Sequence, residues 1–316
     1  MNIVRTAVIG VGSLGQHHAR ILGQHPKSKL EFIVDTDEKR AEKIAKSNDA
    51  QAKPVVLTDF MQLIGKVDAV VISAPTQFHY QIAKPLLESE IHCLVEKPIT
   101  LNVEEAEELI EIAKSKNVIL QVGHVERFNP AVIAAAPYVR NPKFIEVNRL
   151  GPYDSRTAHI GVILDLMIHD LDMLFYLVKD KVLAFEAHGA KILSDTEDIA
   201  KVRLKFANGC VADVSASRVS MDKYRRIRIF QPDAYISVDY AGKSLKMYTK
   251  KEGKEKITSL FDIDIKKPKI PSNEPLFYEL DNFLSSVMEG KKPAVSGEQG
   301  RDAVELALNI LKQMQF

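Results

Sequence analysis

The sequence contains little cysteine, no long apolar run and no excess of charge of either sign. Cys93 and Cys210 are the only cysteines among 316 residues, and they lie far apart in strand-like runs. Their spacing fits neither a disulfide framework nor a set of metal ligands, which predicts a chain that folds in the reducing cytoplasm. No apolar stretch has the length of a signal peptide or of a bilayer span, so no membrane association is expected.

The charges of the chain nearly cancel. Lys and Arg number 43 and Asp and Glu number 42, which gives a net charge of +1. This balance gives no electrostatic reason to expect nucleic acid or an anionic membrane as a partner, so any anionic ligand must be bound by local groups. The length and a hydrophobic content of 46% are sufficient for two ordinary globular domains.

The first part of the chain alternates short β-branched runs with amphipathic stretches. This alternation predicts a doubly wound, mainly parallel sheet with helices on both faces, and we place this domain at residues 1–122. The predicted strands are residues 5–10, 30–35, 54–57, 68–75, 92–97 and 118–123, and the predicted helices are 37–47, 77–89 and 102–116.

The pattern changes after residues 123–130, "GHVERFNP". The following runs have the period of two that is typical of strands with one buried face, and Asn208-Gly209 predicts a hairpin turn. We therefore predict a second α/β domain, 123–316, with a mainly antiparallel sheet and a solvated Lys-rich loop at 250–270. Its expected elements are the strands 198–206, 210–219, 225–230, 234–240 and 244–250 and the helices 162–178, 273–290 and 297–314.

A glycine motif follows the first predicted strand. Gly10, Gly12 and Gly15 have G-x-G-x-x-G spacing, and such glycines let the backbone approach a pyrophosphate at a helix N-terminus. Asp35 lies at the end of the second strand, where a carboxylate accepts hydrogen bonds from the ribose of NAD and repels the 2′-phosphate of NADP. The alternative is a glycine-rich turn in a flavodoxin-like protein without a dinucleotide. The motif predicts NAD in preference to NADP, bound by Gly10, Gly12, Ser13, Leu14, Gly15 and Asp35.

Lys97 ends the fifth predicted strand and precedes Pro98, in "VEKPIT". The proline favours an extended backbone at Lys97, and open α/β sheets bind ligands at the carboxyl ends of their strands. Lys97 is therefore a candidate to act on a bound substrate. For this segment alone, a Lys-Pro pair that merely ends a strand at the surface is the simpler interpretation.

The apolar segment 162–178 carries four ionisable groups, in "DLMIHDLDML". At helical spacing Asp165, His169 and Asp172 share one arc, and Asp170 points elsewhere. Buried charges cost on the order of several kcal/mol unless they are paired, so these groups are either paired or functional. For His169 alone, a hydrogen-bonded core histidine is the simpler interpretation. A metal site of Asp165, His169 and Asp172 is a minor alternative because one helix would supply every ligand, and no metal is expected.

Taken together, these motifs resemble the Gfo/Idh/MocA family of sugar oxidoreductases over essentially the whole chain. The resemblance implies a Rossmann domain followed by an α/β domain with an open, mainly antiparallel sheet, which often forms the interface of a homo-oligomer (dimer or tetramer). It also implies that the C-terminal helix, about 298–314, packs back near the first domain. The segments that carry the resemblance are "GVGSLG", "SAPTQFHYQIAKPLLESEIHCLVEKP", "VGHVERFNP", the Asp165 and His169 pair, "EPLFYELDNFL" and "GEQGRDAVELALNIL".

The resemblance also implies catalytic residues. Removal of a hydride from an alcohol carbon requires removal of the hydroxyl proton, which histidine is suited to accept near neutral pH. The resemblance makes His169 this base, Asp165 the group that orients its imidazole, and Lys97 a donor that stabilises the developing alkoxide. The cofactor itself carries the redox chemistry. The nicotinamide half of NAD is expected against Ala74, Pro75, Thr76, His79, Glu96 and Lys97.

The expected substrate is a sugar or a nucleotide sugar. "GHVERFNP" and "LDLMIHDLDM" resemble the branch of the family that includes UDP-N-acetylglucosamine 3-dehydrogenases, and arginines would suit the diphosphate of such a substrate. The alternatives are a free-sugar or inositol dehydrogenase, a glycosidase that uses NAD transiently and a non-catalytic NAD sensor. The candidate substrate ligands are Arg127, Asn129, Tyr153, Arg156 and His169, with Arg218, Tyr224 and Arg225 as further anion ligands, whereas Arg226 and Arg228 are expected to be solvated.

Overall fold

A computed structural model of the chain describes residues 3–48, 50, 53–154, 160–242, 244–251, 253 and 258–314. The chain forms two compact units, of which the first comprises residues 1–125 and 275–305 and the second comprises 126–274 and 306–316. The first unit therefore extends three residues beyond the predicted boundary at 122. It also includes a C-terminal segment that the sequence pattern placed in the second domain.

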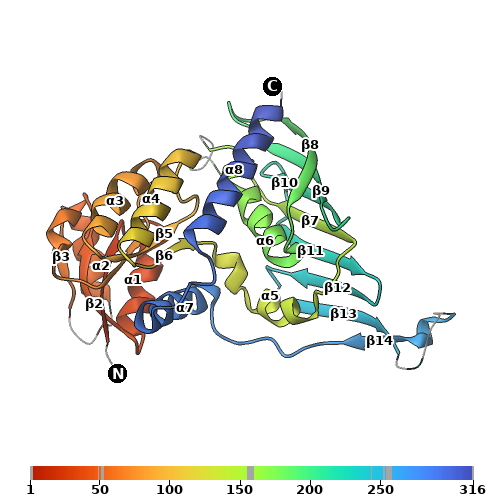
Figure 1. Cartoon of the computed structure of the whole chain (residues 1–316), viewed down its shortest axis with the longest axis horizontal. Coiled ribbons are helices and arrows are strands. Elements are labelled where there is room, and N and C mark those ends of the chain that lie inside the picture. Colours follow the sequence, from red (N-terminus) through yellow and green to blue (C-terminus); the bar gives the residue numbers. More distant parts are fainter. Residues whose placement is uncertain are drawn as a thin grey trace. The chain divides into compact units, whose positions relative to one another are not determined.

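The first unit contains a six-stranded parallel sheet in the order β3-β2-β1-β4-β5-β6 (Figure 1). This is the strand order of dinucleotide-binding Rossmann folds, in which the order reverses between β1 and β4 and leaves a crevice at the carboxyl ends of the strands. The predicted doubly wound sheet is confirmed. The strands are β1 (Val4–Ile9), β2 (Ser28–Val34), β3 (Val55–Leu57), β4 (Ala69–Ile72), β5 (His92–Glu96) and β6 (Leu120–Gly123).

The helices of the first unit bury their apolar faces on this sheet. Asp37 and Asn102 cap two of them by accepting hydrogen bonds from the N–H groups of Arg40 and Glu105, which explains where these helices begin. Leu280 and Phe283 of the C-terminal segment are buried in the same core as the first and second strands, which explains why this segment belongs to the unit. The helices are α1 (Gly15–Gln24), α2 (Glu38–Ser47), α3 (His79–Glu88), α4 (Val103–Ser115) and α7 (Pro275–Glu289), with 3-10 turns at η1 (Phe60–Leu63) and η2 (Thr76–Phe78).

The second unit contains an eight-stranded sheet in the order β14-β13-β12-β11-β7-β10-β9-β8. Only β7 and β10 pair in parallel, so the sheet is mainly antiparallel, as predicted. Asn208 and Gly209 form the turn between β9 and β10, where Gly209 has a φ of +81°. The strands are β7 (Phe144–Leu150), β8 (Val182–Ala190), β9 (Ile199–Phe206), β10 (Val211–Ser217), β11 (Tyr224–Gln231), β12 (Ala234–Asp239), β13 (Ser244–Lys250) and β14 (Ile263–Lys266).

Several elements of the second unit were not predicted. The sequence pattern did not indicate β7, β8 or β14, and β14 lies within the segment that was expected to be a solvated loop. Arg149, a charged residue at a buried position, interrupts the alternation of apolar and polar residues by which β7 could have been predicted. The remaining elements of this unit are the helices α5 (Pro130–Ala135) and α6 (Ile168–Val178), the π-helical turn η6 (Ile163–Met167), the 3-10 turns η3 (Val125–Phe128), η4 (Ala136–Tyr138) and η7 (Leu260–Asp262), and the end of α8 (Gly297–Gln313).

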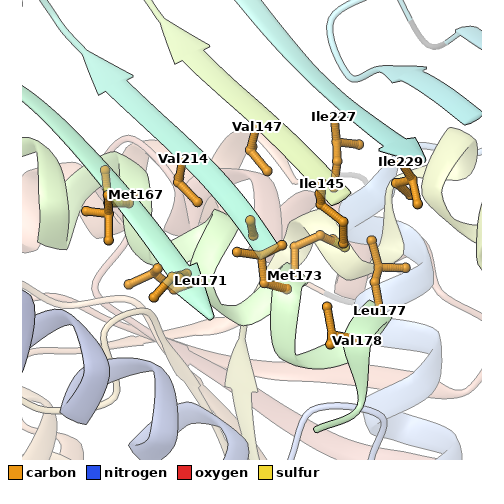
Figure 2. Close-up of a cluster of buried hydrophobic side chains, with 14 of the residues drawn as sticks. Ile145, Val147, Met167, Leu171, Met173, Leu177, Val178, Val214, Ile227 and Ile229 are labelled. Atoms are coloured by element: carbon orange, nitrogen blue, oxygen red, sulfur yellow. The ribbon is translucent and has the colours of Figure 1, made fainter. Parts of the chain in front are cut away.

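One face of the antiparallel sheet is covered by the predicted 162–178 helix. Figure 2 shows Met167, Leu171 and Leu177 facing Val147 and Ile227 of the sheet, within a cluster of buried apolar side chains. The helix differs from the prediction in its first turn, which is π-helical, with the N–H of Ile168 bonded to the carbonyl of Ile163. Such single wide turns are rare and frequent at functional sites. Among the described residues, no helix is both long and apolar enough to cross a membrane.

Candidate functional site

The glycine loop lies at the carboxyl end of β1, before α1. Gly10 has a φ of +81°, and a Cβ there would lie 2.7 Å from the backbone nitrogen of Ala74. A Cβ on Gly15 would lie 1.8 Å from the carbonyl oxygen of Gly10, so α1 can approach the loop this closely only without a side chain. A Cβ on Gly12 would meet nothing within 4 Å, and no side chain caps the helix N-terminus. The loop therefore fits a pyrophosphate at the N-terminus of α1.

Asp35 follows β2 and is 7% exposed. One carboxylate oxygen accepts the N–H of Val11 in the glycine loop at 2.9 Å, and the other accepts the N–H of Asp37 at 2.9 Å. The Nη1 atom of Arg40 lies 3.5 Å from Oδ2 of Asp35. The carboxylate thus fixes the glycine loop and lies where the ribose of NAD is recognised in Rossmann folds.

The loop after β4 brings Ala74, Pro75 and Thr76 beside the glycine loop. Pro75 precedes the 3-10 turn that Thr76 begins, and His79 begins α3. The ring nitrogens of His79 lie 2.8 Å from the carbonyl oxygen of Ala74 and 2.9 Å from that of Pro98. Burial lowers the pKa of His79 despite these carbonyls, so the neutral ring can donate to only one of them at a time. His79 therefore connects the loop after β4 to the turn that follows β5.

Lys97 lies in this turn and is partly exposed, and its peptide bond to Pro98 is cis. The backbone N–H of Lys97 donates to a carboxylate oxygen of Glu96 at 3.2 Å. The other oxygen of Glu96 lies 2.7 Å from Nε2 of His18 on α1. The structure thus brings the glycine loop, the loop after β4 and the Lys97 turn together at the carboxyl edge of one sheet.

Asp165 and His169 are both partly exposed in the second unit. Asp165 lies in the π-helical turn and His169 in the first turn of α6. The Nδ1 atom of His169 is buried. The spacing of four residues predicts that the two side chains lie on one side of the helix, and this stays a prediction.

Asp170 and Asp172 are fully buried, and arginines neutralise both. Asp170 accepts two hydrogen bonds of 2.8 Å from Arg149, whose third nitrogen donates to Glu126 at 2.9 Å. Burial opposes the charge of Arg149, but the carboxylates of Asp170 and Glu126 outweigh it and raise its pKa well above the usual value. Asp172 is held in the same forked way by Arg127. Of the four ionisable groups on this segment, Asp170 and Asp172 are therefore paired with arginines, and the two that are partly exposed are Asp165 and His169.

The predicted substrate ligands fall in different environments. Arg127 is 5% exposed, paired with Asp172, and stacked over Tyr176. Asn129 is buried and caps α5 by accepting the N–H of Ala131. Tyr153 is 39% exposed, and Arg156 lies outside the described residues. The structure thus gives Arg127 and Asn129 structural partners, and their contact with substrate stays a prediction.

Arg218 is also buried, directly after β10, and it contacts the segment between β8 and β9. Its guanidinium donates to Asp198 at 2.6 Å, to the carbonyl of Ile160 and to the hydroxyls of Ser194 and Thr196. These contacts favour a structural role for Arg218 over the anion ligand that the sequence suggested. Tyr224 is half-buried and Arg225 exposed at the start of β11, while Arg226 and Arg228 form surface ion pairs, as expected.

Arg149, Glu279 and His18 are titratable residues in buried positions that the sequence interpretation missed. Arg149 follows Ile145 and Val147 at a spacing of two on the buried face of β7, and this position was the available signal. Glu279 is fully buried on α7 between Leu276 and Phe283 at helical spacing. His18 is fully buried three residues after Gly15. A titratable residue that has the same periodicity as the buried apolar residues of its strand or helix indicates a partner that the sequence alone does not identify.

The Rossmann topology, the glycine loop, Asp35 and the lysine turn together define an NAD-binding oxidoreductase with a second α/β unit. Residues 4–124 match the model described as "Oxidoreductase family, NAD-binding Rossmann fold", and residues 141–237 match the "GFO/IDH/MocA C-terminal domain". The chain belongs to the Gfo/Idh/MocA family of NAD-dependent oxidoreductases, as its motifs predicted.

Individual relatives cover nearly the whole chain. It is 34% identical to the UDP-N-acetylglucosamine 3-dehydrogenase of Acidithiobacillus ferrooxidans, over 97% of this chain and 96% of that protein. It is 27% identical to the myo-inositol 2-dehydrogenase of Thermotoga maritima, over 99% and 96%. The solved structure of the Acidithiobacillus enzyme, GnnA, matches with a TM-score of 0.90 and 32% identity over 99% of this chain and 98% of that one. Levoglucosan dehydrogenase in complex with NADH matches at 0.86 with 19% identity over 99% and 97%, which shows the shared fold alone.

Proposed function

We propose that the protein is an NAD-dependent dehydrogenase that oxidises the C3 hydroxyl of UDP-N-acetylglucosamine to a keto group. The observation that carries this proposal is the 34% identity to the Acidithiobacillus enzyme of that activity over 97% of the chain. A likeness of this length includes both units, so it extends to the unit expected to select the sugar. The myo-inositol 2-dehydrogenase of Thermotoga maritima, at 27% identity, supports the same reaction class with a different substrate.

The residues of the first unit fit the cofactor. The open space at Gly12, the N-terminus of α1 and the carboxylate of Asp35 suit a pyrophosphate and a ribose. When bound, NAD supplies the acceptor for the hydride that leaves the alcohol carbon. We place Ala74, Pro75, Thr76, His79 and Glu96 along its nicotinamide half.

We assign the proton chemistry to Lys97 and His169. The ammonium of Lys97 donates a hydrogen bond to the substrate oxygen and stabilises the charge that develops as its proton leaves. The imidazole of His169 accepts that proton, and because its Nδ1 is buried we assign this role to Nε2. Asp165, on the same side of the helix, orients the ring and stabilises its cationic form.

The arginines for the diphosphate are a separate part of the proposal. Arg225 is exposed at the start of β11, and Arg156 remains a candidate substrate ligand on the basis of the sequence. A guanidinium recognises a phosphate with two parallel hydrogen bonds, for which its donors must be available. Arg127 is paired with Asp172, so its contribution to binding is tested separately below.

We also propose a cytoplasmic homo-oligomer that buries a row of aromatic side chains on β7, β11, β12 and β13, on the face of the eight-stranded sheet opposite α6. Half-buried aromatic side chains cross four neighbouring strands on this face, with ring centroids 5.0 to 5.9 Å apart. Surface ion pairs such as Arg228 with Glu146 lie on the same face. An apolar row rimmed by charged groups is typical of protein interfaces. The row consists of Phe144, Phe230, Tyr235 and Tyr248.

The activity is tested by the absorbance of NADH with NAD and a panel of UDP-N-acetylglucosamine, UDP-glucose, free hexoses and inositols. The proposal predicts NADH with UDP-N-acetylglucosamine, lost in Lys97→Ala and in His169→Ala but kept in Lys201→Ala, a change at an exposed lysine of β9. Activity with inositols alone would replace the nucleotide sugar by the second candidate. Binding of NAD without NADH from any member of the panel would favour the transient-oxidation glycosidase or the sensor.

A further inference from the structure

A buried cluster of three titratable side chains lies directly behind Lys97. It consists of His18 from α1, Glu96 from the end of β5 and Glu279 from α7, and one atom of each lies within 4.8 Å of the others. All three side chains are buried. In the part of the chain that the structure describes, no other group of three histidine, cysteine or acidic side chains is gathered this closely.

Glu96 has partners for both carboxylate oxygens. His18 lies 2.7 Å from one of them, and the backbone N–H of Lys97 donates to the other at 3.2 Å. The position leaves no spare room, since a Cβ on Gly123 of β6 would lie 2.8 Å from the second oxygen. The orientation of Glu96 and that of the Lys97 backbone are therefore coupled.

No N–H or hydroxyl group of the described residues donates a hydrogen bond to either carboxylate oxygen of Glu279. The groups that face it are Glu96 from β5, His18 from α1 and the neutral Gln121 from β6, which donates to the backbone carbonyl of Glu279 at 3.3 Å, and the described residues place no lysine or arginine among them. Burial and the charge of Glu96 raise the pKa of Glu279 well above its ordinary value. Two carboxylates this close in a buried site cannot both be ionised without a compensating charge.

We propose that Glu279 is a positioning residue that stays protonated at neutral pH and shares its proton with Glu96, which holds the Glu96 carboxylate against His18 and the Lys97 amide. This proton compensates the second carboxylate in place of a lysine or arginine, which the described residues do not supply at Glu279. Its loss would place two adjacent charges behind the Lys97 turn and displace the lysine. The positioning of Lys97 rests on the catalytic role proposed for it, whereas the bound proton does not.

The proton is tested by stability as a function of pH. A glutamic acid whose pKa is raised on folding weakens the folded state as the pH rises from the unfolded pKa, near 4.3, toward the folded one, by up to about tenfold in the folding equilibrium constant per pH unit. Glu279→Gln keeps the shape of the side chain and its lack of charge. The ratio of its folding equilibrium constant to that of wild type is therefore expected to increase by up to about tenfold per pH unit across this range. Glu88→Gln, at an exposed site on α3, is the control and should show no such trend. A pH-independent ratio for Glu279→Gln would overturn the bound proton, as would a stoichiometric divalent metal in the purified protein.

The positioning role is tested by kinetics with the active sugar from the panel. Glu279→Leu removes the hydrogen-bonding group and is expected to lower kcat by roughly tenfold or more while the KM of the sugar changes little, since a small misplacement of a catalytic group is costly. Glu279→Gln is expected to rescue most of the loss. An unchanged kcat in Glu279→Leu, or a Glu279→Gln variant as slow as Glu279→Leu, would overturn the positioning role. If no sugar is oxidised, the proposed function fails, while the pH dependence of stability still tests whether Glu279 holds a proton.

Discussion

The forked pair of Arg127 and Asp172 provides the sharpest test of how the second unit is built. Arg127 donates to the two oxygens of Asp172 at 2.7 and 2.5 Å, and the side chains are 3% and 1% exposed. Removing one partner of a buried pair leaves an uncompensated charge and costs about 3–5 kcal/mol. We therefore expect Asp172→Asn to lower the free energy of unfolding by this amount. For a unit of this size, this corresponds to a fall in Tm of roughly 6–20 °C.

A matched control exists in the same unit. Arg203 donates to the two oxygens of Asp213 at 2.7 Å each, with the same forked geometry, but its side chain is 54% exposed and that of Asp213 33%. Pairs that solvent screens contribute about 0–1 kcal/mol, so Asp213→Asn should lower the free energy of unfolding by no more than this. Urea and thermal unfolding of both variants measure the difference. Equal losses in the two variants would refute the reasoning, because burial is the principal difference between the pairs.

The double variant Arg127→Met, Asp172→Leu separates the two roles that Arg127 could have. Replacement of both charges by apolar groups removes the desolvation cost as well as the attraction, so most of the lost stability should return. If Arg127 acts only in this pair, the KM for the sugar nucleotide recovers together with stability. A double variant that is stable but keeps a raised KM would instead confirm the sequence prediction that Arg127 binds substrate.

Three further predictions concern single side chains. Gly15→Ala should abolish measurable NAD binding, since its Cβ would lie 1.8 Å from the carbonyl oxygen of Gly10, whereas Gly151→Ala, with open space around its Cβ, should bind NAD normally in calorimetry. Asp35→Ser should weaken NAD binding by about tenfold or more, the loss of a charged hydrogen bond, and raise the use of NADP relative to NAD, with Arg40 close to the site; unchanged cofactor preference would contradict this assignment. Burial disfavours the charge of Asp198, but the N–H groups of Leu193 and Ile192 and the guanidinium of Arg218 outweigh it and hold its pKa well below the usual value. The stabilising contribution of Asp198 is therefore complete above the pKa of the unfolded state, about 3.9, and is lost as the pH falls toward the pKa of the folded state. The difference in free energy of unfolding between wild type and Asp198→Asn should therefore narrow in acid. A difference that does not depend on pH would show that the charge of Asp198 does not stabilise the fold.

The parallel sheet of the first unit could be predicted from the sequence, whereas the place of α7 in this unit could not. Its strands are buried β-branched runs, its helices are amphipathic, and residues such as Asn102 mark helix starts, so local preferences and the global fold agree. The glycine loop was equally readable, because a φ of +81° at Gly10 and the contact of Gly15 with Gly10 require glycine. Here the chemistry of single residues determines the geometry.

The second unit and the partners of its charges were less predictable. The segment 144–150 was missed as a strand because Arg149 occupies a buried position that the distant Asp170 and Glu126 make tolerable. Likewise, nothing local shows that Arg127 meets Asp172. Long-range ion pairs depend on tertiary contacts, whereas periodicity reports only which face an element buries. The same limit concealed Glu279, whose neighbours come from α1 and β5.

The central claim is that the protein transfers a hydride from C3 of UDP-N-acetylglucosamine to NAD. We would measure this with UDP-N-acetylglucosamine carrying deuterium at C3, with mass spectrometry of the reduced cofactor and of the sugar product. The account predicts one deuterium in the cofactor and a 3-keto sugar nucleotide in equal amount, both absent with His169→Ala. Reduced cofactor without deuterium, or deuterium that stays in the sugar, would contradict it.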